Sequence, residues 1–124
     1  MAEQPLVWIV DDDAAIRELL SFIVSEDGYR VEAFLSGTEV LAAAGPTPAA
    51  VLLDLMMPEV DGIEVLKELR RRHPSLPVII LTAVSDIGRA VEVTKLGAYD
   101  YLTKPVDKDR LLTTLRRAVT QHNL

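Results

Sequence analysis

The chain contains no cysteine, which excludes disulfide bonds and thiolate metal sites. It also has no long apolar run. The longest one, Pro77 to Leu81 with Ala83 and Val84 beyond Thr82, is far too short to cross a bilayer. The first residues lack the positively charged and apolar segments of a secretory signal peptide. Together these absences predict a cytoplasmic protein that does not enter a membrane.

Positive charge is also scarce. The chain has 13 Lys and Arg residues against 19 Asp and Glu residues, which gives a formal net charge of −6. Arg70–Arg72 is the only basic run, and it ends a predicted helix, where cations complement the helix dipole. Because nucleic acid binding requires a concentrated basic face, we expect no direct binding of nucleic acid.

The chain does show a repeated change of hydrophobic pattern. Short apolar runs, typical of strands, alternate with segments whose apolar residues recur at helical spacing. The predicted strands are Leu6–Val10, Tyr29–Leu35, Val51–Asp54, Val78–Thr82 and Tyr99–Thr103. Three predicted helices are Ile16–Val24, Ser36–Ala44 and Asp86–Leu96, and a fourth runs from the loop at Gly62 to about His73. A fifth, the last, is marked by Leu111, Leu112, Leu115 and Val119. Asp13 is the predicted N-cap of the first helix, and Gly28 is its predicted end. This alternation predicts one doubly wound α/β domain, residues 1–124, whose parallel sheet has helices on both faces.

The predicted helix Asp86–Leu96 has the weakest pattern. Ile87, Ala90 and Val91 form a thin apolar stripe, and Gly88 lowers the helix propensity. A weakly anchored element is a candidate moving part.

Polar side chains stand where four of the predicted strands end. Asp11, Asp12 and Asp13 follow the first strand, and Asp54, Thr82 and Lys104 end or follow three others. In a parallel sheet these ends share one edge, where open α/β folds bind ligands. Carboxylates, a hydroxyl and an amine at one edge suit a divalent cation and a phosphoryl group.

The residue types indicate a specific chemistry. Asp11, Asp12 and Asp54 would repel one another unless a cation lay between them, and an all-oxygen set suits Mg²⁺. A carboxylate can attack phosphorus as a nucleophile, while Lys104 pairs with a phosphoryl oxygen and Thr82 donates to another. Each residue alone has an ordinary structural role, so the joint arrangement carries the hypothesis.

These motifs resemble the receiver domain of two-component response regulators. The resemblance covers essentially the whole chain and consists of Asp11-Asp12, Asp54 with Met57-Pro58 and Gly62, Thr82-Ala83, and Lys104-Pro105. The stretches 7–13, 72–80 and 97–102 are similar to receivers of sigma-54-dependent activators of the nitrogen-regulator C (NtrC) type. The resemblance implies a flavodoxin-like (βα)5 three-layer sandwich with strand order 2-1-3-4-5.

The resemblance also implies roles for individual residues. Asp54 matches the phosphoacceptor, and Asp12, Asp54 and the backbone carbonyl of Met56 match the direct Mg²⁺ ligands. Asp11 matches the acid that holds a metal-bound water. Thr82 and Lys104 match the switch hydroxyl and the phosphate-pairing lysine, and Tyr101 matches the switch aromatic.

The resemblance further implies partners. A sensor histidine kinase would supply the phosphoryl group. The response would appear on the face made by the helix at 86–96, the strand at 99–103 and the last helix, which would act on an output domain or a downstream protein, or form a homodimer. Transcription regulation is the expected outcome.

Two other classes of protein are alternatives to a response regulator receiver domain. A metal-dependent phosphohydrolase with an aspartyl intermediate usually has a second acid near the nucleophile, which Asp54-Leu55-Met56 lacks, and a cap domain. A flavodoxin-like cofactor binder needs a Ser/Thr/Gly-rich loop after the first strand, where this chain has aspartates. Phosphorylation without turnover of a generic phosphate ester would separate the switch from the enzyme.

Overall fold

A parallel sheet forms the centre of the structure, a computed structural model that describes residues 4–57, 61–83 and 87–122. Within these residues the strand order is β2-β1-β3-β4-β5, which confirms the predicted fold. The strands are β1 (Leu6–Val10), β2 (Arg30–Phe34), β3 (Ala50–Asp54), β4 (Val78–Ala83) and β5 (Asp100–Lys104). All the neighbouring pairs are parallel, so their carboxyl ends lie at one edge.

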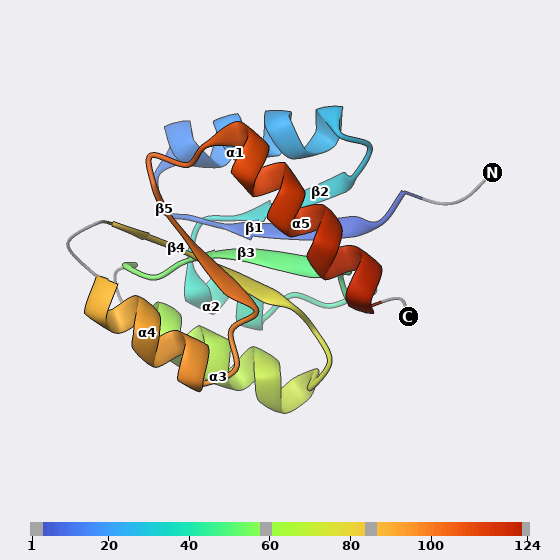
Figure 1. The fold of residues 1–124 in the computed structure, drawn as a ribbon. Coiled ribbons are helices and arrows are strands. Elements are labelled where there is room, and N and C mark those ends of the chain that lie inside the picture. The colour runs from blue at the N-terminus through green and yellow to red at the C-terminus, as the bar shows by residue number, and fades with distance from the viewer. Residues whose placement is uncertain (1–3, 58–60, 84–86, 123–124) are drawn as a thin grey trace.

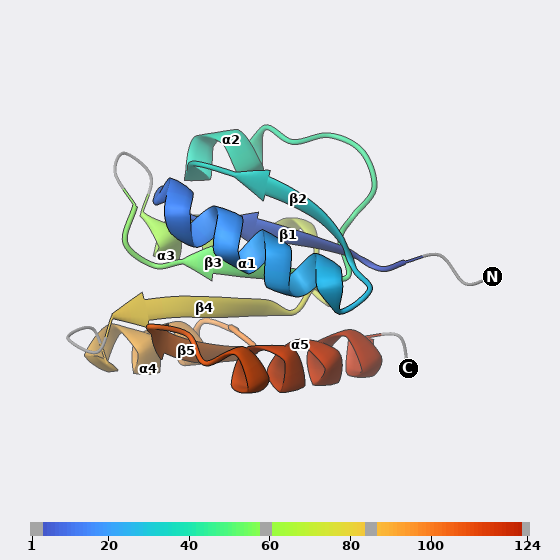
Figure 2. The ribbon, with the colours of Figure 1, turned by 90° about the horizontal axis from the view of Figure 1, so that it is seen from above.

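Helices cover both faces of the sheet (Figure 1). They are α1 (Ala14–Glu26), α2 (Gly37–Leu41), α3 (Gly62–Arg72), α4 (Ile87–Lys95) and α5 (Lys108–His122). Helices α1 and α5 lie on one face, and α2, α3 and α4 lie on the other, as the view from above also shows (Figure 2). Among the described residues, no helix combines the length and apolarity needed to cross a membrane.

The sheet divides the core into two layers because successive strand residues point to opposite faces. In β3 every residue is buried, as expected for a central strand covered on both sides. Ala50 and Leu52 pack toward the layer of α1 and α5, whereas Val51 and Leu53 pack toward the layer of α2, α3 and α4. A strand buried on both faces holds its last residue, Asp54, in a fixed position.

Most predicted helix signals are confirmed. Asp13 caps α1, accepting hydrogen bonds from the backbone N–H groups of Ala15 and Ile16. Gly28 ends this helix with a positive φ of 97°, which glycine adopts without strain. The apolar residues predicted for the last helix, Leu111, Leu112, Leu115 and Val119, are all buried.

Some predicted boundaries are wrong by one to three residues. Helix α2 ends at Leu41 rather than Ala44, and Ala42 is its C-cap. Strand β5 begins at Asp100 and ends at Lys104, so each of its ends lies one residue later in the sequence than predicted. The predicted start of the fourth helix at Asp86 lies outside the described residues.

The predicted apolar stripe of α4 is also wrong at Val91, which is 49% exposed. Among the α4 side chains that the structure describes, the one that packs into the core is Val93, and the predicted stripe residues Ile87 and Ala90 have side chains outside the described part. Side chains two positions apart on a helix differ by about 200° in direction, so Val91 and Val93 face opposite sides of α4. The sequence shows that Val91 is apolar, but it does not show which side of α4 packs against the sheet.

Candidate functional site

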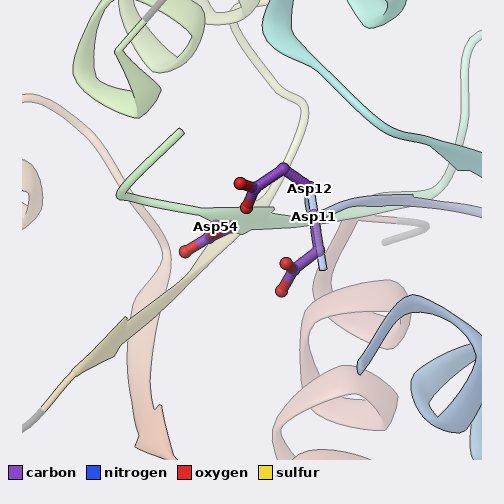
Figure 3. Close-up of side chains that lie close together, drawn as sticks. All are labelled: Asp11, Asp12 and Asp54. Carbon is purple, nitrogen blue, oxygen red and sulfur yellow. The ribbon is translucent and has the colours of Figure 1, made fainter. Parts of the chain in front are cut away.

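Three carboxylates meet at the carboxyl edge of the sheet (Figure 3). Asp11 and Asp12 follow β1, and Asp54 is the last residue of the adjacent strand β3. Together with Met56 and Lys104 they line an open depression of about 250 Å³; its other lining residues are Asp13, Ile16 and Ala83. The predicted gathering of polar strand ends is therefore present.

Asp54 is nearly buried, with 4% of its surface exposed. Its Oδ1 accepts a hydrogen bond from the backbone N–H of Met56 at 3.3 Å and lies 3.3 Å from the Lys104 ammonium. Burial, followed by the charge of Asp11, raises the pKa of Asp54 to about 6, although Lys104 and the Met56 N–H act in the opposite direction. At neutral pH this carboxyl group is therefore mainly an anion, but a poorly solvated one.

Asp11 is completely buried, and hydrogen bonds fix its orientation. Its Oδ1 accepts from the backbone N–H of Asp13 at 2.9 Å, and its Oδ2 accepts from Lys104 Nζ at 3.0 Å. The backbone carbonyl of Asp11 accepts from Arg17 Nη1 at 2.8 Å. Asp12, in contrast, is exposed.

Lys104 supplies the compensating positive charge. It ends β5, in register with Ala83 of β4, and its side chain extends over the edge of the sheet to β1 and β3. Burial lowers the pKa of Lys104, but the hydrogen bond to Asp11 and the charges of both carboxylates outweigh it and raise the pKa overall. The amine is therefore an ammonium group at neutral pH.

The predicted switch residues lie beside the depression rather than in it. Thr82 is buried, with 1% exposure, and its Oγ1 donates to the carbonyl oxygen of Ala83 at 3.3 Å. Tyr101 is half-buried and packs against the core layer of α2, α3 and α4. Neither residue lines the depression, which Ala83 borders instead.

The donor set fits a hard divalent cation. Asp11, Asp12 and Asp54 each offer a carboxylate oxygen, and these oxygens all lie within 4.8 Å of one another. Mg²⁺ prefers oxygen ligands and commonly takes one or two carboxylates together with waters and phosphate oxygens. One ammonium group faces three carboxylates here, so the site keeps excess negative charge that a cation would compensate.

Arg17 was missed as a contributor to the site. Arg17 directly follows the first turn of α1, the turn that Asp13 caps. Its guanidinium donates a hydrogen bond to the backbone carbonyl of Asp11. In the sequence it is an ordinary charged residue of an amphipathic helix. Only the path of the loop between β1 and α1 brings its guanidinium within reach of that carbonyl.

Residues 7–116 match the family model described as "Response regulator receiver domain". The DNA-binding transcriptional regulator NtrC of Salmonella typhimurium is 44% identical over 121 residues, which are 97% of this chain and 26% of that protein. The transcriptional regulatory protein FixJ of Bradyrhizobium diazoefficiens is 38% identical over 93% of this chain and 57% of its own length. The chain thus spans about a quarter of NtrC and just over half of FixJ.

Solved structures agree with these matches. The receiver domain of NtrX from Brucella abortus superposes with a TM-score of 0.88 at 33% identity, covering 92% of this chain and 98% of that one. A CheY-like receiver domain protein from Methanospirillum hungatei has a TM-score of 0.90 at 27% identity, covering 97% of each chain.

Proposed function

The chain belongs to the response regulator receiver domain family, and from this premise we propose that Asp54 accepts a phosphoryl group from a sensor histidine kinase. Receiver domains are signalling domains, so family membership favours the phosphorylation-dependent switch over the phosphohydrolase and the flavodoxin-like cofactor binder. We propose that the receiver domain comprises residues 1–124.

One observation carries the assignment of the phosphoacceptor. Asp54 is the carboxylate that ends the central strand, and it lies within reach of both the other carboxylates and the ammonium of Lys104. Of the three acids at this edge, Asp11 is fully buried and held by two hydrogen bonds through its side chain. All three line the depression, but Asp54 alone is the last residue of a fully buried strand, which fixes its position as a nucleophile requires.

The reaction would proceed by in-line displacement. A carboxylate oxygen of Asp54 attacks the phosphorus, a new P–O bond forms, and the bond to the donor nitrogen of the kinase phosphohistidine breaks with its electron pair. The leaving ring carries a proton on its other nitrogen, so it departs as a neutral imidazole. Because the transition state is loose, positioning and charge neutralisation provide most of the catalysis.

The surrounding residues have separate proposed roles. Asp12, Asp54 and the backbone carbonyl of Met56 would hold Mg²⁺, with Asp11 binding through a water. When bound, Mg²⁺ neutralises negative charge on the phosphoryl oxygens. Lys104 would move from its carboxylate partners to a phosphoryl oxygen, and Thr82 would donate its hydroxyl to another.

Loss of the phosphoryl group would occur by hydrolysis. Water must approach the phosphorus on the side opposite Asp54, near the rim that Met56 helps to form. The Met56 side chain is 54% exposed, and a thioether does not orient water as a polar group would. Met56 is therefore proposed not to assist the attack of water on the phosphoryl group.

The wider role is proposed by similarity. NtrC and FixJ are transcriptional regulators, so we place this receiver in transcription regulation, acting in the cytoplasm through an output domain or a downstream protein. The signal would leave through α4, β5 and α5 and could include homodimer formation on that face. Direct contact with nucleic acid is not proposed for this domain.

Incubation with acetyl phosphate and Mg²⁺ tests the assignment. Intact-mass spectrometry should show one added phosphoryl group on the parent protein and loss of the principal labelling in Asp54→Asn. Asp27→Asn is the matched control, because Asp27 pairs with Arg116 on the surface between α1 and α5. Equal labelling of Asp54→Asn and the parent would contradict the assignment.

A further inference from the structure

An ion pair joins the beginnings of α3 and α4. Arg89, in the first turn of α4, donates from Nη2 to both carboxylate oxygens of Asp61, at 2.8 and 2.7 Å. Asp61 is the N-cap of α3 and also accepts from the backbone N–H of Ile63. The two helices lie side by side on the same face of the sheet (Figure 1). The pair therefore fixes the start of one helix to the start of its neighbour.

The same guanidinium also contacts the phosphoacceptor site. Arg89 Nη1 lies 2.9 Å from the sulfur of Met56, and Met56 lines the depression that contains Asp54. Arg89 itself does not line the depression. One side chain thus connects α4, the cap of α3 and the rim of the site.

Local helix stability does not explain the position of Arg89. A cation in the first turn opposes the helix dipole, and α4 has no acidic residue in that turn to compensate. Asp61, for its part, caps α3 through its bond to Ile63 and needs no arginine to do so. The pair is partly exposed, but Nη2 of Arg89 contacts both carboxylate oxygens of Asp61 while Nη1 contacts Met56, and these contacts constrain both side chains.

Apolar anchoring is sparse among the side chains of α4 that the structure describes, those of residues 89 and 91–95. Of these, only Val93 is buried. A helix held by few apolar contacts is easily displaced, so a directional contact in its first turn has a large influence on where it lies.

We propose that the Arg89–Asp61 pair is a latch that holds α4 in its resting position, and that this latch opens when Asp54 is phosphorylated. The inference rests on the proposed function of Asp54. Displacement of the first turn of α4 separates the two partners, so the pair stabilises the resting state alone. Removing either partner therefore shifts the population toward the active state. Through Met56, opening of the latch also frees the rim of the site.

Backbone amide NMR of α4 in the unphosphorylated protein tests the latch. The parent spectra without and with beryllofluoride and Mg²⁺ define the two end points for each amide. Arg89→Ala and Asp61→Asn should both move the α4 amides toward the active end point, corresponding to a change of about threefold in the equilibrium. Asparagine keeps the cap of α3, and Asp61→Asn leaves the sequence of α4 unchanged. The double variant should move no further than either single variant.

Two controls separate a latch from a structural contact. Arg71→Ala removes an arginine of α3 whose partner, Glu68, is on the same helix, and it should leave the α4 amides at their parent positions. Arg89→Lys keeps the charge but has one nitrogen at its end, so it cannot contact Asp61 and Met56 through separate nitrogens as Arg89 does, and it should give an intermediate shift. An α4 that stays at its resting position in Arg89→Ala and Asp61→Asn would overturn the latch.

The remaining outcomes are also decisive. A shift in Arg89→Ala without one in Asp61→Asn would reflect the removal of a cation from the first turn of α4, and it too would overturn the latch. If the parent responds to beryllofluoride while the variants behave as the parent does, the latch alone fails. If the parent shows no response, the proposed function fails and the latch fails with it.

Discussion

The ammonium of Lys104 lies 3.0 Å from Oδ2 of Asp11, a residue with no exposed surface. The same ammonium lies 3.3 Å from Asp54, so in the resting domain one cation serves two buried carboxylates. A phosphoryl group on Asp54 would bring new oxygens within its reach. The resting contact therefore keeps the lysine at the site and also keeps the two acids compatible with a folded core.

Replacing Lys104 by methionine should destabilise the domain. The substitution leaves Asp11 and Asp54 buried without a counter-charge, and we expect a loss of about 2 kcal/mol at pH 7, less at pH 5 where Asp54 takes up a proton. Urea unfolding in EDTA measures this change. Lys67→Met is the control, because Lys67 is exposed and pairs with the exposed Glu64, and it should change stability by less than about 0.5 kcal/mol. Equal effects of the two substitutions would contradict the role given to Lys104.

The raised pKa of Asp54 predicts a pH dependence of stability without metal. The folded pKa is about 6 against the ordinary aspartate value of 3.8, so between these values the folded state binds more protons than the unfolded state. Its contribution to stability is therefore present below about pH 4 and is lost as pH rises to about 6, by roughly 1.4 kcal/mol for each unit of the shift. In EDTA, Asp54→Asn should remove most of this slope and be the more stable protein at pH 7. An unchanged slope in this variant would show that Asp54 is not the titrating group.

Asp12 should matter for metal binding more than for folding. It is the exposed member of the three carboxylates, so Asp12→Ala should weaken Mg²⁺ binding by about tenfold while slightly stabilising the metal-free domain. Titration with Mg²⁺ measures the affinity. Asp13→Asn, which keeps a capping side chain on α1, should change the affinity by no more than about twofold. A loss in Asp13→Asn as large as in Asp12→Ala would mean that bulk negative charge, not ligation, attracts the ion.

The sequence was sufficient for features that depend on pattern and order along the chain. Asp54 and Lys104 meet because parallel strands end at a common edge, and Asp13 caps α1 because the cap directly precedes the apolar helical pattern. Contacts made by long side chains between separate elements gave no such signal. Arg17 and Arg89 reach carbonyl, carboxylate and sulfur partners whose positions depend on loop paths and helix rotation, as does the exposure of Val91.

Gly62 is expected to be required for the start of α3. A Cβ at this position would lie 2.7 Å from the backbone oxygens of Asp54 and Leu55, atoms that cannot move without displacing the end of β3. Gly62→Ala should therefore destabilise the domain by about 2 kcal/mol, and weaken Mg²⁺ binding by moving Asp54. Gly88→Ala is the contrasting control, because its Cβ would meet nothing within 4 Å and alanine favours a helix. Thermal unfolding of the two variants should show shifts of opposite sign.

Thr82 should couple phosphorylation to α4 without being needed for phosphorylation itself. Its hydroxyl donates to the carbonyl of Ala83 in the resting domain, so a bond to a phosphoryl oxygen would exist only after modification of Asp54. An interaction present in one state alone shifts the equilibrium toward that state, and this shift is what the hydroxyl contributes. Thr82→Ala should therefore still gain one phosphoryl group from acetyl phosphate, but show much smaller amide shifts in α4 and at Tyr101 on adding beryllofluoride and Mg²⁺. Thr82→Ser, which retains the hydroxyl, should respond as the parent does. Shifts in Thr82→Ala as large as those in Thr82→Ser would assign the coupling to another group, and Lys104, the other proposed phosphate partner, would be the next to test.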